Sequence, residues 1–253
     1  MGALYARRTM RTVILCGGRG TRAYPSTLEL PKPLLPVGDQ PVLAHLMGIY
    51  AAQGFTDFVL AAGYLQDHIA AFARDVPSDW HVEVVDTGEE TNTGGRVRRV
   101  ADRVGDEFFL TYADGLGNVD LSALLAFHRS HAGAMTLTTV PLPSQYGTLD
   151  VDGAGRVHGF KEKPRLLDHH INAGFFVVDQ RALELWPEPG EDLEREVLPA
   201  LGDRDELFAF RHLGFWRSMD TYKDAVDLGA MCHDGPGPWL DEPGRPLAAE
   251  GED

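Results

Sequence analysis

A glycine-rich run with two arginines follows the first apolar segment of the chain. The apolar residues are 13–15 and the run CGGRGTR occupies residues 16–22, with Lys32 ten residues beyond Arg22 and between two prolines. Glycines allow a tight turn that brings backbone N–H groups within reach of phosphate oxygens. Arg22 and Lys32 can supply the positive charge that neutral amides lack. The pattern predicts a binding site for an anionic phosphate chain, such as that of a nucleoside triphosphate.

The same run also fits a dinucleotide-binding fingerprint. Residues 18–23 match G-x-G-x-x-G/A, and Asp39 lies near the distance at which that motif carries a ribose-binding acid. The motif needs a helix that begins within the glycines, whereas Pro25, Pro31 and Pro33 keep this segment irregular. We therefore disfavour a dinucleotide-dependent reductase. A Walker A loop is excluded because no Gly-Lys-Ser/Thr sequence follows the glycines.

Several acidic and basic residues stand where a strand or helix of the predicted fold begins or ends. Asp114 follows the apolar segment 108–112, and ligands gather at the ends of strands in open α/β sheets. Asp220 precedes a predicted helix, where it could instead cap the helix. Glu162 and Lys163 are consecutive on a predicted strand, so their side chains point to opposite faces, as on an exposed edge strand. These positions alone permit both a structural and a functional interpretation.

Composition narrows the class of protein. The net charge of −15 argues against a nucleic-acid partner, because phosphate backbones require a basic surface. No apolar stretch approaches the roughly 18–20 residues of a membrane helix, so we expect no membrane partner and a cytoplasmic location. The two cysteines, Cys16 and Cys232, lack C-x-x-C spacing, and the ten histidines lack the spacing of metal ligands such as H-E-x-x-H.

Short β-rich segments alternate with helical segments in the first half of the chain, and the second half has patterns typical of antiparallel strands. We expect an α/β fold with a doubly wound, Rossmann-like, mixed and mostly parallel sheet and a smaller antiparallel C-terminal part. The expected strands are Thr12–Leu15, Asp57–Ala61, His81–Asp86, Phe108–Tyr112, Ala134–Val140, Gly147–Val151, Val157–Glu162 and Ile171–Val178. The expected helices are Pro41–Gln53, Leu65–Arg74, Arg96–Val104, Leu121–His131, Arg181–Trp186, Leu193–Leu201 and Thr221–Met231.

We expect one domain, over residues 11–232. Residues 1–10 contain no apolar core long enough for a signal peptide and are expected to form a flexible extension. Residues 233–253 lack apolar periodicity and end in acidic residues. They predict a loose acidic tail that Trp239 and Leu240 pin to the domain.

Several motifs, taken together, resemble those of one enzyme family. CGGRGTR followed by LPKPLLPVGDQPVL resembles the opening signature of the sugar-phosphate nucleotidyltransferases. Further motifs sharpen this to the glucose-1-phosphate cytidylyltransferases. They are VDTGEETNTGGRVRRV from Val85, FLTYADG from Phe109, YGTLDV from Tyr146, FKEKP from Phe160, INAGFFVVD from Ile171 and GFWRSMDTYKDAV from Gly214. They follow the family's order over roughly residues 12–240, nearly the whole chain.

The resemblance implies that a sugar 1-phosphate attacks the α-phosphorus of a nucleoside triphosphate in line and releases pyrophosphate. Catalysis is then positioning and charge neutralisation, without a covalent enzyme intermediate. The catalytic residues implied are Arg22, Lys32, Asp114 and Lys163. The nucleotide-binding residues implied are Leu15, Gly17, Gly18, Gly20, Thr21, Arg22, Thr93, Gly94 and Gly95. The residues implied for the sugar phosphate are Gly147, Glu162, Lys163, Asn172, Gly174 and Trp216. Asp114 and Asp220 would hold Mg²⁺, and a homo-oligomer is implied as well.

The chain departs from the cytidylyltransferase pattern at two places. Glu29 and Leu30 precede Pro31, where those enzymes carry a basic residue, and the connection from Ala73 to Val82 lacks an insertion. CTP and glucose 1-phosphate are the favoured substrates, but another base or a related hexose or cyclitol phosphate stays open. A catalytically silent paralogue that binds nucleotide sugars is an alternative of another class, which the joint presence of the residues named for catalysis and metal binding disfavours.

Overall fold

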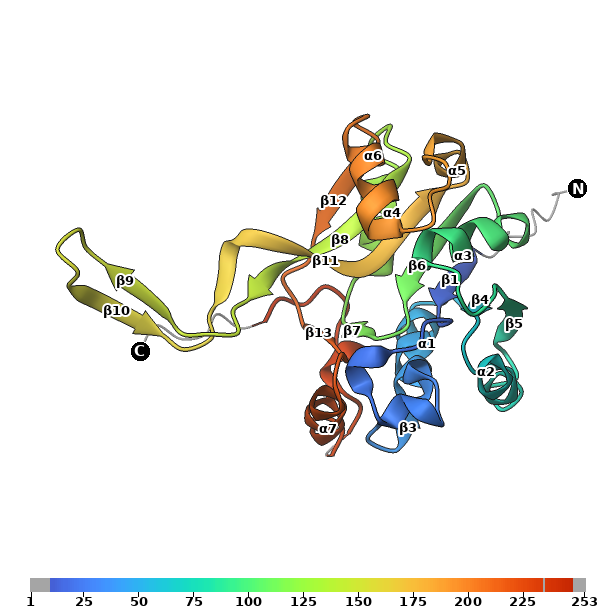
Figure 1. Ribbon diagram of the computed structural model, residues 1–253, viewed down its shortest axis with the longest axis horizontal. Helices are drawn as coiled ribbons and strands as arrows, with labels where there is room; N and C mark the ends of the chain where they lie inside the picture. The colour runs from blue at the N-terminus through green and yellow to red at the C-terminus, as the bar shows by residue number, and fades with distance from the viewer. Residues whose placement is uncertain (1–9, 234, 248–253) are drawn as a thin grey trace, which may run out of the picture.

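The computed structural model describes residues 10–233 and 235–247, and a seven-stranded sheet forms its centre (Figure 1). Strand β11 is antiparallel to both of its neighbours, and the other pairs of adjacent strands are parallel. This confirms the mixed, mostly parallel sheet. In spatial order the strands are β12 (Leu207–Arg211), β8 (Met135–Pro143), β11 (Arg165–Asp179), β6 (Glu107–Tyr112), β1 (Thr12–Leu15), β4 (Asp57–Ala62) and β5 (His81–Asp86).

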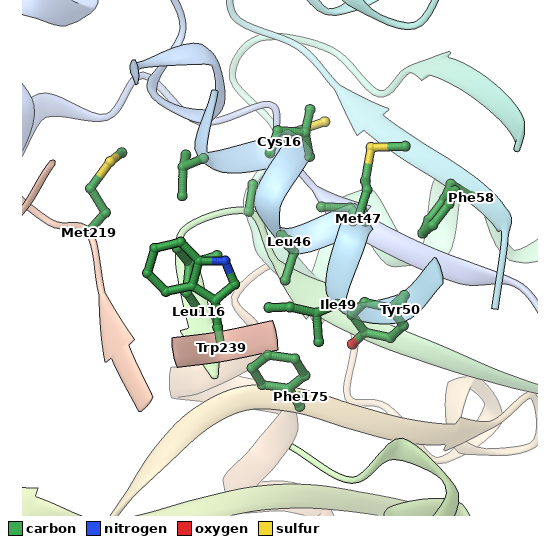
Figure 2. Packing of buried hydrophobic residues seen from close by; sticks show 14 of the residues in the cluster. Cys16, Leu46, Met47, Ile49, Tyr50, Phe58, Leu116, Phe175, Met219 and Trp239 are labelled. Atoms are coloured by element: carbon green, nitrogen blue, oxygen red, sulfur yellow. The ribbon is translucent and has the colours of Figure 1, made fainter. Parts of the chain in front are cut away.

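The central strands are buried because helices cover both faces of the sheet. Successive side chains of a strand point to opposite faces, so Ile14 joins one apolar cluster while Val13 and Leu15 join the other. Figure 2 shows the first cluster, in which Leu46 and Tyr50 of one helix pack near other buried side chains. The helices are α1 (Val42–Ala52), α2 (Gln66–Phe72), α3 (Thr93–Arg99), α4 (Leu121–His128), α5 (Ala182–Leu185), α6 (Leu198–Gly202) and α7 (Tyr222–Ala230).

Helix α3 begins three residues before the expected start at Arg96. Two glycines near its start allow it to pack closely against residues 190 and 191. A Cβ added at Gly94 would lie 2.4 Å from the carbonyl oxygen of Gly190, and one at Gly95 would lie 2.1 Å from a carboxylate oxygen of Glu191. Glycine therefore belongs inside this helix for steric reasons, in spite of its low helix propensity.

Three two-stranded antiparallel pairs accompany the central sheet. Strands β9 (Thr148–Val151) and β10 (Val157–Lys161), close to two of the expected strands, form a hairpin that projects from the body as a long arm (Figure 1). The other pairs are β7 (Gly115–Gly117) with β13 (Trp216–Ser218) and β2 (Pro36–Val37) with β3 (Gln40–Pro41). Neither of these two pairs was predicted, nor was β12.

Residues 235–247, which follow helix α7, pack against the body, whereas we expected a loose tail. Trp239 is buried and its ring meets the edge of His45. Asn118 holds the next residues, because its side-chain amide donates to the carbonyl oxygens of Glu242 and Arg245. Trp239 is thus the anchor that the sequence indicated. The expectations for residues 1–9 and 248–253 lie outside the described residues.

Candidate functional site

A cavity of about 560 Å³ lies at the carboxyl ends of the neighbouring parallel strands β1 and β6. Leu15 and Tyr112, the last residues of these strands, are paired and both line it. The loops that leave the two strands therefore form adjacent walls, as at ligand sites of open α/β sheets. The residues predicted for the site that line the cavity are Leu15, Gly17, Gly18, Gly20, Arg22, Lys32, Thr93, Asp114, Asn172, Trp216 and Asp220.

Lys32 joins the two aspartates that we expected to act together. Its ammonium group lies 2.5 Å from a carboxylate oxygen of Asp114 and 3.2 Å from one of Asp220. Arg22 reaches the same oxygen of Asp220 at 3.0 Å, and the hydroxyl of Ser218 donates to its other oxygen at 3.1 Å. Two cations and two carboxylates therefore meet at one point of the cavity wall.

Strand pairing brings Asp220 to Asp114 from more than a hundred positions away. Asp114 stands between β6 and β7, and β13 pairs with β7 so that Ser218 lies opposite Gly115. The N–H of Met219 then donates to the carbonyl oxygen of Asp114 at 2.8 Å. The short β7–β13 ladder thus fixes the spacing of the two carboxylates.

The carboxylates of Asp114 and Asp220 suit a divalent cation. The ammonium of Lys32 contacts both carboxylates, so one oxygen of each carboxylate points toward the same position. Carboxylate oxygens are also the hard ligands that Mg²⁺ prefers. The residues present therefore fit the metal site that the resemblance implied.

A second group of potential metal ligands lies elsewhere on the sheet. Glu107, His128 and Asp179 bring ligand atoms within 4.8 Å of one another. Arg129 forms an ion pair with Glu107, however, and Arg181 forms one with Asp179. These ion pairs make the group part of a charge network, and none of its three residues lines the cavity.

Arg96 forms the floor beneath the glycine-rich loop. It is buried, and burial lowers the pKa of its guanidinium below the ordinary value for arginine. The guanidinium donates to the hydroxyl of Thr87 and to backbone carbonyl oxygens. Those oxygens belong to Gly17 at 2.9 Å, Ala62 at 3.1 Å, Gly88 at 2.8 Å and Glu89 at 3.2 Å. A Cβ at Gly17 would lie 2.1 Å from this guanidinium, so glycine is required there.

The N–H groups of Gly94 and Gly95 serve the fold instead of a ligand. The resemblance implied that both glycines bind the nucleotide. Both groups donate to the carbonyl oxygen of Glu191, at 2.8 and 3.1 Å, and neither glycine lines the cavity. Thr93, the first residue of α3, does line it. Thr21 lies beside the cavity-lining Gly20 without lining the cavity itself.

Three residues predicted to bind the sugar phosphate lie on the projecting arm. Glu162 and Lys163 have side chains that are 64% exposed, and they pair only loosely with each other at 3.8 Å. Gly147 packs against the ring of Phe160 on the same arm. None of these residues lines the cavity of its own chain. In this chain, these three residues therefore lie outside the cavity that contains Asp114.

Gly174 and Trp216 shape the wall near Asn172. The φ angle of Gly174 is 79°, and a Cβ there would lie 2.4 Å from the ring of Tyr112. Gly174, which the resemblance implied for the sugar phosphate, therefore makes room for Tyr112. The indole of Trp216 donates to the carbonyl oxygen of Ala173 at 2.9 Å, which fixes the indole as part of the cavity wall.

Comparison with known proteins agrees with this geometry. Residues 11–232 match the nucleotidyl transferase family. The chain belongs to the nucleotidyltransferases. It is 37% identical to the glucose-1-phosphate cytidylyltransferase of Salmonella typhi, over 91% of this chain and 98% of that protein. It is 36% identical to the probable glucose-1-phosphate cytidylyltransferase of Bacillus subtilis, over 91% and 99% respectively.

A solved structure shares the fold of this nucleotidyltransferase. It is the crystal structure of HddC from Yersinia pseudotuberculosis complexed with GMP-PN, with a TM-score of 0.67 and 23% identity. The match covers 87% of this chain and 98% of that chain. Among the described residues of the nucleotidyltransferase, no helix has the length and apolar character needed to cross a membrane.

Some lining residues of the nucleotidyltransferase were not predicted. They are Thr91 and Asn92 before α3, Tyr112 at the end of β6, and Glu194 in the π-helical turn Leu193–Val197, where the helix expected over Leu193–Leu201 begins. Tyr112 could have been found, because it is the residue at which a predicted strand reaches the ligand side of the sheet. Glu194 carries no such signal, since only the tertiary packing of its turn against α3 brings it to the cavity.

Proposed function

We propose that this nucleotidyltransferase joins a nucleoside triphosphate to a sugar 1-phosphate and releases pyrophosphate, with CTP and glucose 1-phosphate as the first choice of substrates. The observation that carries the proposal is a single cavity that contains the glycine-rich loop, Lys32 and the paired carboxylates of Asp114 and Asp220. The names of the most similar relatives support the choice of substrates. A protein that only binds nucleotide sugars needs no such pair of carboxylates.

The cavity supplies what in-line phosphoryl chemistry requires. An oxygen of the sugar phosphate forms a bond to the α-phosphorus, and the bond from that phosphorus to the pyrophosphate oxygen breaks. Backbone N–H groups of the loop that contains Gly18 and Gly20 bind the triphosphate, and Arg22 neutralises its pyrophosphate end. Lys32 holds the α-phosphate as charge builds on it. The protein contributes positioning and electrostatic stabilisation, so no side chain needs to act as a nucleophile.

We propose Asp114 and Asp220 as the ligands of a Mg²⁺ ion. When bound, the ion neutralises phosphate charge and orients the triphosphate. Lys32 now occupies the position between the two carboxylates, and its flexible chain allows the ammonium to turn from them to a phosphate oxygen. Arg22 can likewise leave Asp220 and bind the triphosphate. Both cations are therefore held ready beside the position where the phosphates bind.

We also propose a homo-oligomer in which the arm of one copy completes the cavity of another. Two observations support it: Glu162 and Lys163 lie outside the cavity of their own chain, and the arm exposes large apolar side chains. Those side chains are Tyr146, Leu149, Val151, Val157 and Phe160. Covering such side chains in a subunit contact is favourable, and Lys163 would bring a further cation to the sugar phosphate. Sedimentation velocity tests the oligomer, and a monomer with full activity would contradict it.

Pyrophosphate release tests the proposed reaction. The purified chain is assayed with ATP, CTP, GTP, UTP and dTTP, each against a panel of hexose and cyclitol 1-phosphates in the presence of Mg²⁺. We expect the fastest release with CTP and glucose 1-phosphate. Release with another pair would keep the reaction and correct the substrates, whereas no release with any pair would refute the reaction.

A further inference from the structure

One carboxylate, that of Glu194, links three walls of the cavity. One of its oxygens accepts a hydrogen bond from the hydroxyl of Thr93 at 2.8 Å, and the other accepts one from the hydroxyl of Tyr112. The oxygen of Tyr112 in turn accepts from the side-chain amide of Asn172 at 3.3 Å. These partners come from α3, β6 and β11, and all four residues line the cavity.

The direction of every bond in this network is determined by Glu194. An ionised carboxylate can only accept, so the protons of both hydroxyls point toward it. The oxygen of Thr93 then accepts from the N–H of Leu193 at 3.0 Å, and the carbonyl oxygen of the Asn172 side chain accepts from the N–H of Gly174 at 2.9 Å. Each carboxylate oxygen of Glu194 keeps a second lone pair, and the side chain is exposed to the cavity.

A carboxylate is an unexpected group in a cavity that binds two phosphate esters. Within residues 10–233 and 235–247, Glu194 forms no ion pair with a basic side chain, unlike Asp114 and Asp220. Its negative charge therefore repels both substrates. Hydrogen bonds donated by a ligand offset such a charge, and charge-assisted bonds of this kind are strong. The donors that a sugar phosphate or a nucleotide carries beside its phosphates are hydroxyl groups.

Tyr112 holds Glu194 in place, because its hydroxyl donates to one carboxylate oxygen while its own oxygen accepts from the side-chain amide of Asn172. Glu194, Tyr112 and Asn172 together form a rigid polar wall on the side of the cavity that we assign to the sugar.

We infer that Glu194 is a specificity-determining residue that accepts a hydrogen bond from a hydroxyl of the sugar 1-phosphate. The inference rests on the proposed reaction and names a contact within it. Asn172 lies on the other side of the shared Tyr112 hydroxyl, so one sugar ring can reach both side chains. The ribose of the nucleoside triphosphate carries the same chemical group, and the experiment separates the two sources.

The test combines variants of Glu194 with substrates that lack single hydroxyls. Pyrophosphate release is measured for the wild type, Glu194→Ala and Glu194→Gln with glucose 1-phosphate and with its 2-, 3-, 4- and 6-deoxy analogues. We expect Glu194→Ala to raise the KM for glucose 1-phosphate about ten- to a hundredfold while the KM for CTP changes little. One deoxy analogue should show the same loss with the wild type and no further loss with Glu194→Ala.

Other outcomes would overturn the inference. If the increase in KM caused by Glu194→Ala and the increase caused by each deoxy analogue multiply when they are combined, Glu194 does not bind a sugar hydroxyl. If instead the effects of Glu194→Ala and of 2′- or 3′-deoxy-CTP on KM are not multiplicative, Glu194 binds the ribose. If the wild type releases pyrophosphate and Glu194→Ala keeps its KM, the inference fails while the proposed reaction stands. If the wild type releases none with any pair, the proposed reaction itself fails.

A matched control separates recognition from support of the turn. Glu196 lies in the same turn, accepts a bond from the N–H of Glu191 at 3.0 Å, and does not line the cavity. Glu196→Ala should lower the melting temperature without changing the preference between glucose 1-phosphate and its deoxy analogues. If Glu194→Ala fails to fold, the KM values are measured with Glu194→Gln instead. The amide keeps the shape of the side chain and one acceptor while it removes the charge.

Discussion

The ammonium of Lys32 lies 2.5 Å from a carboxylate oxygen of Asp114, although the two residues are 82 positions apart in the chain. The same ammonium lies 3.2 Å from Asp220. A lysine that we expect to bind phosphate is thus held by the carboxylates that we expect to bind a metal. In the proposed metal site, a cation would compete with Lys32 for these carboxylates and would free the lysine for a phosphate oxygen. The nucleotide and the metal should therefore bind better together than singly.

Replacing Asp114 should separate catalysis from stability. Asp114→Asn keeps the size of the side chain but removes the charge that a metal ligand needs. We expect kcat to fall about 10²–10³-fold, the range found when one preorganised electrostatic contact is lost. The melting temperature should change little, because the side chain is 27% exposed and Lys32 keeps Asp220 as a charged partner. Initial rates and a thermal melt check both parts, and full activity would show that the metal site is assigned wrongly.

Removing the charge of Lys32 should affect metal binding and turnover in opposite directions. Lys32→Met keeps the length of the chain and leaves Asp114 and Asp220 without their shared cation. We expect Mn²⁺, a spectroscopic substitute for Mg²⁺, to bind more tightly in the absence of nucleotide, because no ammonium has to be displaced. Turnover should fall about 10²–10³-fold.

Titration with Mn²⁺ followed by electron paramagnetic resonance gives the affinity independently of activity. Arg22→Met is the matched control, since Arg22 touches only Asp220 of the pair. Its effect on Mn²⁺ affinity should be in the same direction and smaller. A weaker affinity for Mn²⁺ in Lys32→Met would mean that the two carboxylates are not the metal ligands.

The sheet and the cavity loops could be predicted because their signals are local. The apolar run before the glycines and the position of Asp114 after a buried strand each depend on neighbouring residues. Strand β7 is different, since it contains only Gly115–Gly117 and exists because β13 pairs with it. No local pattern of hydrophobic residues marks such a strand.

The sequence predicted which residues belong to the site more completely than it predicted where they lie relative to one another. The resemblance implies that Lys163 binds the sugar phosphate, but the sequence does not indicate that the β9–β10 hairpin projects from the body. In the same way, the resemblance implies that Gly94 and Gly95 bind the nucleotide, whereas in the structure both glycines pack closely against residues 190 and 191. Tertiary packing decided both cases, and the sequence of one segment does not contain it.

Arg96 should contribute to both stability and nucleotide binding. Arg96→Met leaves several buried carbonyl oxygens without donors, each of which costs about 1–3 kcal/mol when unsatisfied. We expect the free energy of unfolding in urea to fall by about 2–5 kcal/mol. Because Gly17 loses its anchor, the KM for the nucleoside triphosphate should rise as well. Arg99→Met is a control on the same helix, and a nucleotide KM unchanged in Arg96→Met would show that the loop holds its shape alone.

Acid should weaken the fold through a buried histidine. His212 is 2% exposed, and burial lowers the pKa of its imidazole below the ordinary value of 6.5, with a further lowering by the charge of Arg165. Its ring nitrogen keeps a bond to the carbonyl oxygen of Phe215 at 3.0 Å. The unfolded chain regains a pKa near 6.5 and takes up a proton that the folded chain refuses. The free energy of unfolding should therefore be highest above about pH 6.5 and decrease as the pH falls below it.

Urea unfolding at pH 7.5, 6.0 and 5.0 measures this dependence. His212→Gln keeps a donor for Phe215 and cannot take up a proton in this range, so its stability should decrease less between pH 7.5 and 5.0 than that of the wild type. Part of the decrease should remain, because burial also lowers the pKa of His131. In the double variant with His131→Gln, the free energy of unfolding should depend even less on pH. Identical pH profiles for the wild type and His212→Gln would show that His212 is protonated in the folded chain as readily as in the unfolded one.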